Sequence, residues 1–246
     1  MLLLRPYVWR SVRVRVHGGS HLDSLEPPFV VFANHSSHLD APLIFGALPW
    51  RLSRFLATGA AGDYFYNKWW KGAPMSLFFN AYPIQRQLST KRKSKKRGKR
   101  GLSAALLADG IPLLIFPEGS RSRTGAMGPF KPGVASLCIS NGAPALPMAL
   151  VGAYDAWPPQ QRHLPKGRPE IHVVIGRPML PRQGEIAHEF NERMRRQVLE
   201  LHDTTARAYG RKTLAEYART LAIESAKTNL DDVTNPDTQR ADQEES

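Results

Sequence analysis

Short apolar runs punctuate the chain and have the composition of strands. Residues 29–32 (Phe-Val-Val-Phe), 113–116 (Leu-Leu-Ile-Phe), 145–151 and 171–175 are apolar and mostly β-favouring, as buried strands are. Residues 12–16 alternate Val with Arg, which is the period of a half-exposed strand. The pattern predicts a sheet of buried strands with one more exposed member.

Helical patterns lie between and after these strands. Residues 101–109 end in Asp-Gly-Ile-Pro, and residues 131–141 end in Asn-Gly, both of which are helix stop signals. An apolar stripe at helical spacing predicts an amphipathic helix over residues 184–202. The stripe consists of Ile186, Phe190, Met194, Val198 and Leu201. Strands alternating with helices predict an α/β fold: a single-domain sandwich whose central mixed sheet is flanked by helices.

The last residues differ in composition from the rest. From about residue 228 the chain is acidic and polar with almost no large apolar groups, so we expect residues 228–246 to be a disordered acidic tail. Residues 1–227 would then form a single domain, large enough to bury a substantial core.

The charge balance is strongly basic. The chain has 34 Lys and Arg against 21 Asp and Glu, a net charge of +13, and without residues 230–246 it keeps 33 bases and 15 acids. Such a surface attracts polyanions: nucleic acid, anionic lipid or phosphorylated substrates. Much of the charge is concentrated in residues 91–100, with bases at Lys91, Arg92, Lys93, Lys95, Lys96, Arg97, Lys99 and Arg100.

The basic run has three interpretations. It is a solvated loop, a contact for anionic lipid, or a nucleic-acid contact. Residues 64–70 and 77–79, just before it, are dense in aromatics, which suits a membrane interface or a buried helix. We expect a contact with an anionic membrane surface and no nucleic acid.

The sequence shows neither a secretory signal nor a spanning helix. Four arginines follow the apolar start too soon for a signal peptide, and no stretch of about 18 uninterrupted apolar residues exists. We therefore expect peripheral attachment at the cytoplasmic face of a membrane. The single cysteine, Cys138, allows no intramolecular disulfide, and its apolar neighbours favour a core residue over a nucleophile.

A first block of chemically capable residues follows the strand at 29–32. It reads Asn34-His35-Ser36-Ser37-His38-Leu39-Asp40 and precedes a helix start at Ala41-Pro42. A connection from strand to helix at the edge of a sheet is where sites are usually built. His35 and Asp40 could meet there, the carboxylate orienting the ring so that its other nitrogen accepts a proton. A base of this kind suits a nucleophile that is the substrate's own hydroxyl. The spacing alone is weak, and a metal site of His35, His38 and Asp40 is an alternative.

A second block follows the strand at 113–116. It reads Pro117-Glu-Gly-Ser-Arg-Ser-Arg-Thr-Gly125, which places hydroxyls and two guanidinium groups in one loop. Arginine forks match phosphate oxygens in bidentate fashion, so the loop is a candidate phosphate site. The alternative is a solvated basic turn.

Together the two blocks resemble the glycerolipid acyltransferase family, whose best-known members are the 1-acyl-glycerol-3-phosphate acyltransferases. The resemblance rests on Asn34-His-x4-Asp40 and on residues 116–122, Phe-Pro-Glu-Gly-Ser-Arg-Ser. Two weaker blocks match in order: residues 82–86, a short apolar run ending in Arg, and residues 143–148, a proline block. The resemblance covers residues 10–202. The basic insert between Arg86 and Gly101 is unusual for the family.

The resemblance implies roles for particular residues. His35 would be the catalytic base and Asp40 its orienting partner. The acceptor's phosphate and glycerol would be bound by Arg86, Glu118, Gly119, Ser120 and Arg121. Because Glu118 cannot itself hold a phosphate, we expect it to position an arginine or an acceptor hydroxyl. Pro147 would shape the acyl-donor side, and Ser120 replaces a common Thr while keeping the hydroxyl.

The implied reaction is direct transfer of a fatty acyl group from acyl-CoA or acyl-carrier protein to a hydroxyl of a glycerol-phosphate-type lipid, with lysophosphatidic acid as the first choice. The thioester is a co-substrate, and no cofactor or metal is implied. The oxyanion would be held by backbone N–H groups near the second block. The sequence has no Gly-x-Ser-x-Gly elbow, P-loop or dinucleotide fingerprint. The alternatives are the same chemistry on a glycolipid or polyketide hydroxyl, and a non-enzymatic basic protein that binds membranes or nucleic acid.

Overall fold

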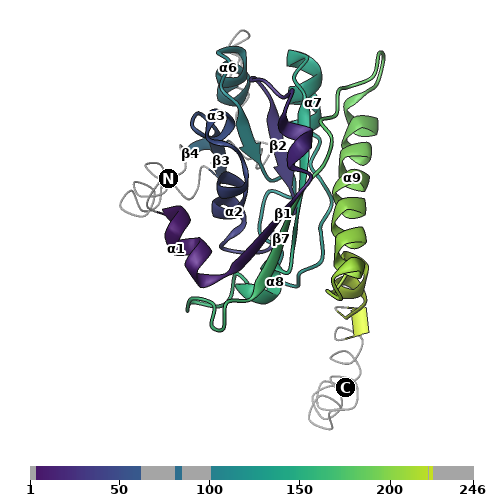
Figure 1. The fold of residues 1–246 in the computed structure, drawn as a ribbon. Helices are drawn as coiled ribbons and strands as arrows, with labels where there is room; N and C mark the ends of the chain where they lie inside the picture. The colour runs from purple at the N-terminus through teal and green to yellow at the C-terminus, as the bar shows by residue number, and fades with distance from the viewer. Residues whose placement is uncertain (1–3, 62–80, 85–100, 221, 224–246) are drawn as a thin grey trace, which may run out of the picture.

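The fold is that of a computed structural model, which describes residues 4–61, 81–84, 101–220 and 222–223 (Figure 1). Within those residues the strands are β1 (Arg13–His17), β2 (Val30–Ala33), β3 (Ala57–Ala61), β4 (Ala81–Ile84), β5 (Leu113–Ile115), β6 (Ala145–Val151) and β7 (Glu170–Ile175). The helices are α1 (Leu4–Ser11), α2 (Asp40–Ala47), α3 (Trp50–Ser53), α6 (Leu102–Ala108), α7 (Gly133–Asn141), α8 (Ala153–Ala156) and α9 (Ala187–Ala208), with a 3-10 turn at Gly19–Leu22. Residues 214–220 form one more helical segment after α9.

The strands form one mixed sheet in the order β1-β7-β6-β2-β5-β3-β4. Every neighbouring pair is parallel except β6 with β7, which run antiparallel. At the centre, β2 lies between β6 and β5, with Val31 opposite both Leu146 and Leu114. The carboxyl ends of these three parallel strands therefore meet at one edge of the sheet, which is where α/β proteins place their sites.

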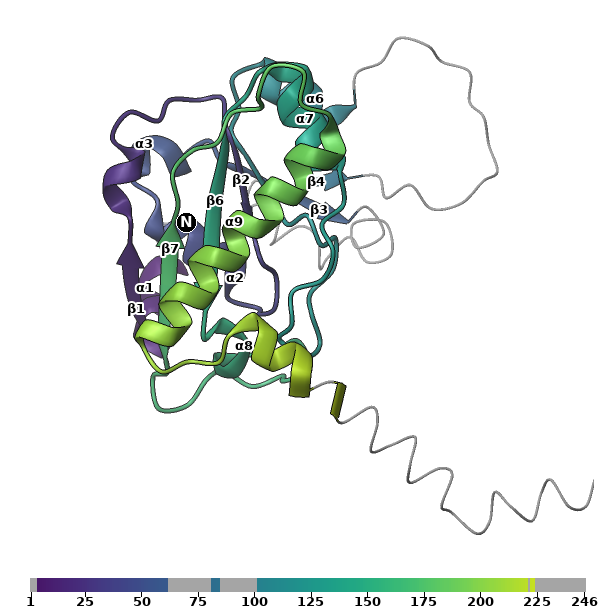
Figure 2. The ribbon, with the colours of Figure 1, turned by 90° about the vertical axis from the view of Figure 1, so that its right-hand side faces the viewer.

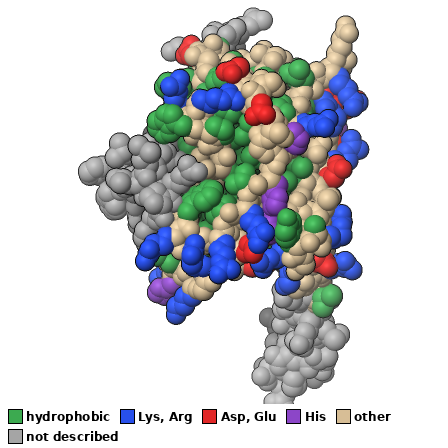
Figure 3. Space-filling view, viewed as in Figure 1, with side chains coloured by type: hydrophobic (Ala, Val, Ile, Leu, Met, Phe, Trp, Pro, Cys, Tyr) green, Lys and Arg blue, Asp and Glu red, His purple; other side chains and the backbone are tan. Residues whose placement is uncertain are grey.

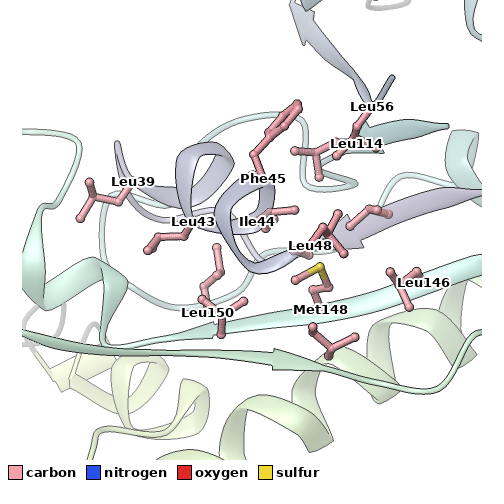
Figure 4. Close-up of a cluster of buried hydrophobic side chains, with 14 of the residues drawn as sticks. Leu39, Leu43, Ile44, Phe45, Leu48, Leu56, Leu114, Leu146, Met148 and Leu150 are labelled. Carbon is pink, nitrogen blue, oxygen red and sulfur yellow. The ribbon is translucent and has the colours of Figure 1, made fainter. Parts of the chain in front are cut away.

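Helices cover both faces of the sheet, as Figures 1 and 2 show, with α1 and α2 on one side and α7 and α9 on the other. The alternation along β2 explains this, because Val31 and Ala33 belong to one buried cluster whereas Val30 and Phe32 belong to the other. Figure 4 shows the first cluster, in which Leu43 and Ile44 of α2 lie with Leu146, Met148 and Leu150 of β6. A sheet buried on both faces needs apolar side chains at consecutive positions, and all seven residues of β6 are buried.

The predicted α/β class and the mixed central sheet are confirmed. The apolar runs at 145–151 and 171–175 correspond to β6 and β7, and the helix predicted for residues 131–141 is α7. The helices expected after Ala41-Pro42 and over residues 101–109 are α2 and α6, whereas the strands β3 and β4 and the helices α1, α3 and α8 were not predicted. The domain boundary at residue 227 and the acidic tail stay predictions, because residues 224–246 lie outside the described part of the chain.

The amphipathic helix is longer and differently placed than predicted. It begins at Ala187, so Ile186 precedes it as the capping residue and is 59% exposed instead of joining the apolar stripe. Phe190, Met194 and Val198 are fully buried against the sheet, as the stripe indicates.

In the part of the chain that is described, no helix combines the length and the apolar character needed to cross a bilayer.

Candidate active site

The first block extends from the carboxyl end of β2. Asn34, the first residue after the strand, is buried and bridges to β6 with both ends of its amide: Nδ2 donates to the Leu150 carbonyl at 3.1 Å, and Oδ1 accepts the Leu150 N–H at 2.9 Å. These two bonds continue the pairing of β2 with β6 by one residue through a side chain. Asn34 therefore fixes the point at which the chain leaves the sheet, and His35 is the next residue.

His35 and Asp40 are hydrogen-bonded to each other. His35 Nδ1 lies 2.7 Å from Asp40 Oδ2, and the same oxygen accepts the backbone N–H groups of Ser36 at 2.7 Å and Ser37 at 2.8 Å. A carboxylate oxygen only accepts, so the proton on His35 is carried by Nδ1, and Nε2 has a free lone pair. Asp40 is fully buried, whereas 21% of the His35 side chain is exposed. Nothing in the described ranges forms a hydrogen bond with His35 Nε2.

The second block holds the backbone and ring of His35 from the neighbouring strand. Phe116, directly after β5, stacks on the imidazole with the ring centroids 3.9 Å apart and the planes 13° from parallel. Glu118 Oε1 accepts the His35 N–H at 2.7 Å, and the Ser122 N–H donates to the His35 carbonyl at 2.7 Å. The two blocks are 80 residues apart in sequence, but they meet because β2 and β5 are adjacent parallel strands.

Glu118 braces the loop through backbone contacts. Besides the His35 N–H it accepts the Gly128 N–H at 2.9 Å through Oε2, so each of its oxygens holds a main-chain group. Burial raises its pKa from 4.5 to about 7, while these two hydrogen bonds oppose the shift. The expectation that Glu118 positions an arginine or an acceptor hydroxyl differs from these contacts, in which its partners are backbone N–H groups.

Several other residues of the second block lie at the surface of the loop. Ser120 and Arg121 are exposed, and Gly119 has a positive φ of 77° that favours glycine. A Cβ on Gly119 would also lie 2.6 Å from Lys131 Nζ, so the lysine side chain passes over this turn. Lys131 was not singled out from the sequence, where it stands as a lone base before a helix.

Arg121 is held by the first block. Its Nη1 lies 2.6 Å from Nδ1 of His38, whose other ring nitrogen lies 3.2 Å from the Pro159 carbonyl oxygen. His38 therefore does not converge with His35 and Asp40 on one centre, as the metal alternative requires. Across the described ranges, no group of three or more His, Cys, Asp and Glu is arranged to hold a metal ion.

The segment that follows β6 and α8 supports both blocks from outside. The Trp157 carbonyl accepts the Ser37 hydroxyl at 2.8 Å, and its indole packs on the His38 ring with centroids 5.0 Å apart. Tyr154 donates its hydroxyl to the Arg123 carbonyl at 2.7 Å. No sequence motif indicates these contacts, because they join residues more than 30 positions apart.

Other predicted residues lie away from this site or outside the described chain. Pro147 is buried in β6, where it is in register with Phe32 and its carbonyl accepts the Gly176 N–H at 2.9 Å. Arg86 and the basic run at 91–100 are outside the described residues, as are the aromatics at 64–70 and 77–79.

Cys138 is fully buried, which confirms it as a core residue, and burial raises the pKa of its thiol to about 12.

The fold and the site together are those of an α/β protein with a histidine–aspartate pair at the carboxyl ends of its central strands. Residues 13–151, more than half of the chain, match the model of the acyltransferase family. The chain therefore belongs to the acyltransferase family, and the resemblance noted in the two sequence blocks is confirmed.

Curated relatives agree with this assignment, and a solved structure shares the fold. The chain is 26% identical over 196 residues to 1-acyl-sn-glycerol-3-phosphate acyltransferase alpha of Ovis aries, which covers 75% of this chain and 59% of that protein. It is 39% identical over 56 residues to a 1-acyl-sn-glycerol-3-phosphate acyltransferase of Cocos nucifera, which covers 23% of this chain and 18% of that protein. The fold is shared with the 1-acyl-sn-glycerophosphate (LPA) acyltransferase PlsC of Thermotoga maritima, with a TM-score of 0.57, 24% identity, and coverage of 79% of this chain and 73% of that one. The chain thus spans about three fifths of the length of the sheep relative.

Proposed function

We propose that this protein transfers a fatty acyl group from a thioester to a hydroxyl of a glycerol-phosphate lipid, with lysophosphatidic acid as the acceptor. One observation carries the proposal: His35 is oriented by Asp40 through Nδ1, its side chain is partly exposed, and no described residue bonds to its Nε2. A base without a protein nucleophile suits a reaction in which the nucleophile is the substrate's own hydroxyl. The relatives' names point to the same acceptor.

The proposed reaction begins with proton abstraction. His35 Nε2 takes the proton of the acceptor hydroxyl as its oxygen attacks the thioester carbonyl carbon, and the buried Asp40 carboxylate stabilises the imidazolium that forms. The tetrahedral intermediate then collapses, the carbon–sulfur bond breaks, and the imidazolium returns its proton to the departing thiolate. The products are the acylated lipid and the free thiol of CoA or of the acyl-carrier protein, and His35 is neutral again.

The oxyanion of the tetrahedral intermediate needs donors close to His35. The N–H groups of His35, Gly119 and Ser122 already donate to Glu118, Phe116 and His35 respectively, so they do not serve. Among the loop residues that the structure describes, the N–H groups of Glu118, Ser120, Arg121 and Arg123 have no acceptor. We assign the oxyanion contact to those of Ser120 and Arg121, which directly follow the turn at Gly119.

The acceptor phosphate is assigned to Arg121, with Arg86 as a second ligand. Arg121 lies in the loop that follows β5, beside the block that carries His35. A guanidinium group matches phosphate oxygens geometrically and keeps its charge at any physiological pH.

The enzyme is proposed to act at the cytoplasmic surface of a membrane, as a peripheral protein. Figure 3 shows Lys and Arg side chains gathered mostly along the lower and right-hand edges of this face, with fewer acidic ones among them. The bases at 91–100 would add to this positive charge, and each base near an anionic membrane surface contributes about 1 kcal/mol to the free energy of binding. Attraction of this kind brings the protein to an acceptor whose acyl tail lies in the bilayer.

An acceptor panel tests the proposal. Purified protein is given palmitoyl-CoA with lysophosphatidic acid, lysophosphatidylcholine, monoacylglycerol or a glycolipid, and thiol release and lipid products are measured. Wild type should acylate lysophosphatidic acid, and His35→Ala should lower the rate by 10²–10⁴, the usual loss of a general base. Transfer only to a glycolipid would keep the chemistry and change the acceptor. If thiol is released with none of the four acceptors, the result would favour a non-enzymatic basic protein.

A further inference from the structure

His38 makes two polar contacts that define its protonation state. Its Nε2 lies 3.2 Å from the Pro159 carbonyl oxygen, which can only accept, so Nε2 carries the ring proton. Its Nδ1 is then an acceptor, and Arg121 Nη1 donates to it at 2.6 Å. The contacts are those of a neutral imidazole that holds a guanidinium group.

The surroundings of His38 favour that neutral form. Partial burial, to which the Trp157 ring contributes, and the charge of Arg121 both lower the pKa of His38, although part of the ring remains at the surface. The Asp40 carboxylate and the bond to Pro159 act in the opposite direction and are outweighed, and His35 adds a small lowering effect. At neutral pH the ring therefore remains an acceptor.

The charge of Arg121 is left uncompensated by this contact. In the described part of the chain, Arg121 forms no ion pair with a carboxylate. A carboxylate partner would orient the guanidinium group but would also compete with an incoming anion. A neutral acceptor orients it through one N–H and leaves the other four donors and the full charge for a ligand.

His38 also ties the position of Arg121 to that of the base. It lies between His35 and Asp40 in the sequence, in a turn fixed by the N–H groups of Ser36 and Ser37, both of which donate to Asp40. A phosphate and the hydroxyl to be acylated are separated by a fixed number of bonds in one acceptor. A rigid link between the phosphate ligand and the base therefore selects acceptors with that separation.

We propose that His38 is a positioning residue for the acceptor: as a neutral acceptor anchored by Pro159 and Trp157, it holds the Arg121 guanidinium group at a set place relative to His35 for an anionic, phosphate-bearing acceptor. The inference rests on the proposed function and deepens it. His38 does not touch the reacting atoms, so its loss should change acceptor binding and not the chemical step.

Two substitutions whose side chains are isosteric with each other separate the orientation of Arg121 from its charge compensation. In His38→Asn the side-chain oxygen takes the place of Nδ1 as a neutral acceptor, and in His38→Asp a carboxylate stands there instead. With lysophosphatidic acid and palmitoyl-CoA, His38→Ala should raise the acceptor KM about tenfold, the order expected for one lost hydrogen bond to a charged group. His38→Asn should restore that KM to within about threefold, whereas His38→Asp should not. The thioester KM should stay unchanged in all three, as should every constant in the control His163→Ala, whose ring is exposed and without a partner in the described structure.

The pH dependence offers a readout that a purely structural role would not change. As the pH falls through the lowered pKa of His38, the ring gains a proton and can no longer accept from Arg121. The ratio of the wild-type acceptor KM to that of His38→Asn should therefore rise toward acid pH. The titration of the acceptor phosphate affects both proteins equally and cancels in the ratio.

The outcomes distinguish this inference from the proposed function. An active wild type whose acceptor KM is unaffected by His38→Ala overturns the inference and leaves the acyltransferase in place. Equal rescue by Asn and Asp overturns it as well. So does an equal rise of the acceptor KM in His38→Ala when the acceptor is monoacylglycerol, which has no phosphate. A wild type that acylates no phosphate-bearing acceptor refutes the proposed function, and the inference with it. Additivity of His38→Ala and Arg121→Ala in the double variant would show that the two residues act independently, against the proposal.

Discussion

Replacing Asp40 by Asn is the most informative change at the dyad, because the structure specifies how the new amide must lie. Asp40 Oδ2 accepts from His35 Nδ1 and from the N–H groups of Ser36 and Ser37, at 2.7–2.8 Å. Those two main-chain donors cannot face an amide NH2, so the Asn oxygen takes the place of Oδ2. The Nδ1–H tautomer of His35 is then retained.

The retained tautomer sets the magnitude. In serine-protease triads the same substitution costs about 10⁴ in rate because the histidine is left in the wrong tautomer. Here only the carboxylate charge is lost, and we expect a loss of about 10², equivalent to about 2.7 kcal/mol of transition-state stabilisation. His35→Ala removes the base itself, so Asp40→Asn should keep more activity than His35→Ala, by up to about a hundredfold if the loss in His35→Ala reaches 10⁴.

The fold should tolerate Asn better than Ala. The Asn NH2 occupies the place of Oδ1, a buried atom without a hydrogen-bond partner in the described structure, so its two N–H donors are left unsatisfied. Asp40→Ala instead leaves three donors without an acceptor, the N–H groups of Ser36 and Ser37 and the Nδ1–H of His35, at about 1–3 kcal/mol each, and also empties the buried space of the side chain. The melting temperature should therefore fall further for Ala than for Asn.

Initial rates of thiol release at saturating palmitoyl-CoA and lysophosphatidic acid measure the kinetic prediction, with melting curves on the same preparations. If Asp40→Asn is as slow as His35→Ala while its melting temperature stays near that of the wild type, the tautomer argument is wrong. A wild-type rate in Asp40→Asn would remove Asp40 from the mechanism altogether.

Other parts of the site lead to separate predictions. Arg121→Ala and Arg86→Ala should raise the acceptor KM with the thioester KM unchanged, since each lost charge-assisted pair costs about 1.5–3 kcal/mol; a rise for the thioester alone would reverse the assignment. Neutralising four of the eight bases in residues 91–100 should strongly reduce flotation with anionic liposomes at low salt, and leave flotation with zwitterionic liposomes and activity on a short-chain soluble acceptor nearly unchanged; equal flotation of both proteins would mean a solvated loop. Burial raises the pKa of Glu118 to about 7, so ionising this carboxyl opposes folding, and the free energy of unfolding should fall as the pH rises from about 4.5 through 7. Denaturant titrations across that range should show a smaller fall for Glu118→Gln than for the wild type. Parallel curves for the two proteins would contradict the buried charge.

The periodicity of apolar residues predicted the central strands and the edge strand β1, and missed β3 and β4 at the opposite edge. β6 is an uninterrupted apolar run because helices cover both faces of the sheet, and such a run is visible in the sequence. β3 (Ala-Thr-Gly-Ala-Ala) and β4 (Ala-Tyr-Pro-Ile) lie at one side of the sheet and contain Gly, Ala and Pro, which have weak strand preference. Their place in the sheet comes from pairing with β5 and with each other.

The dyad could be anticipated because both of its members lie within one turn of chain. Five residues separate His35 from Asp40, and a helix that begins at Asp40 leaves few ways for the two side chains to lie. The local sequence therefore determined the pair of residues and the order of strand, loop and helix around it.

The tertiary structure alone decided the surroundings of that pair. Glu118 binds the backbone of His35, and His38 accepts from Arg121, because two parallel strands 80 residues apart in sequence end side by side. Trp157 and Pro159 reach the same place from the end of β6. Contacts of this kind depend on which strands are neighbours, and strand order is set by the packing of the whole sheet, which no local pattern records.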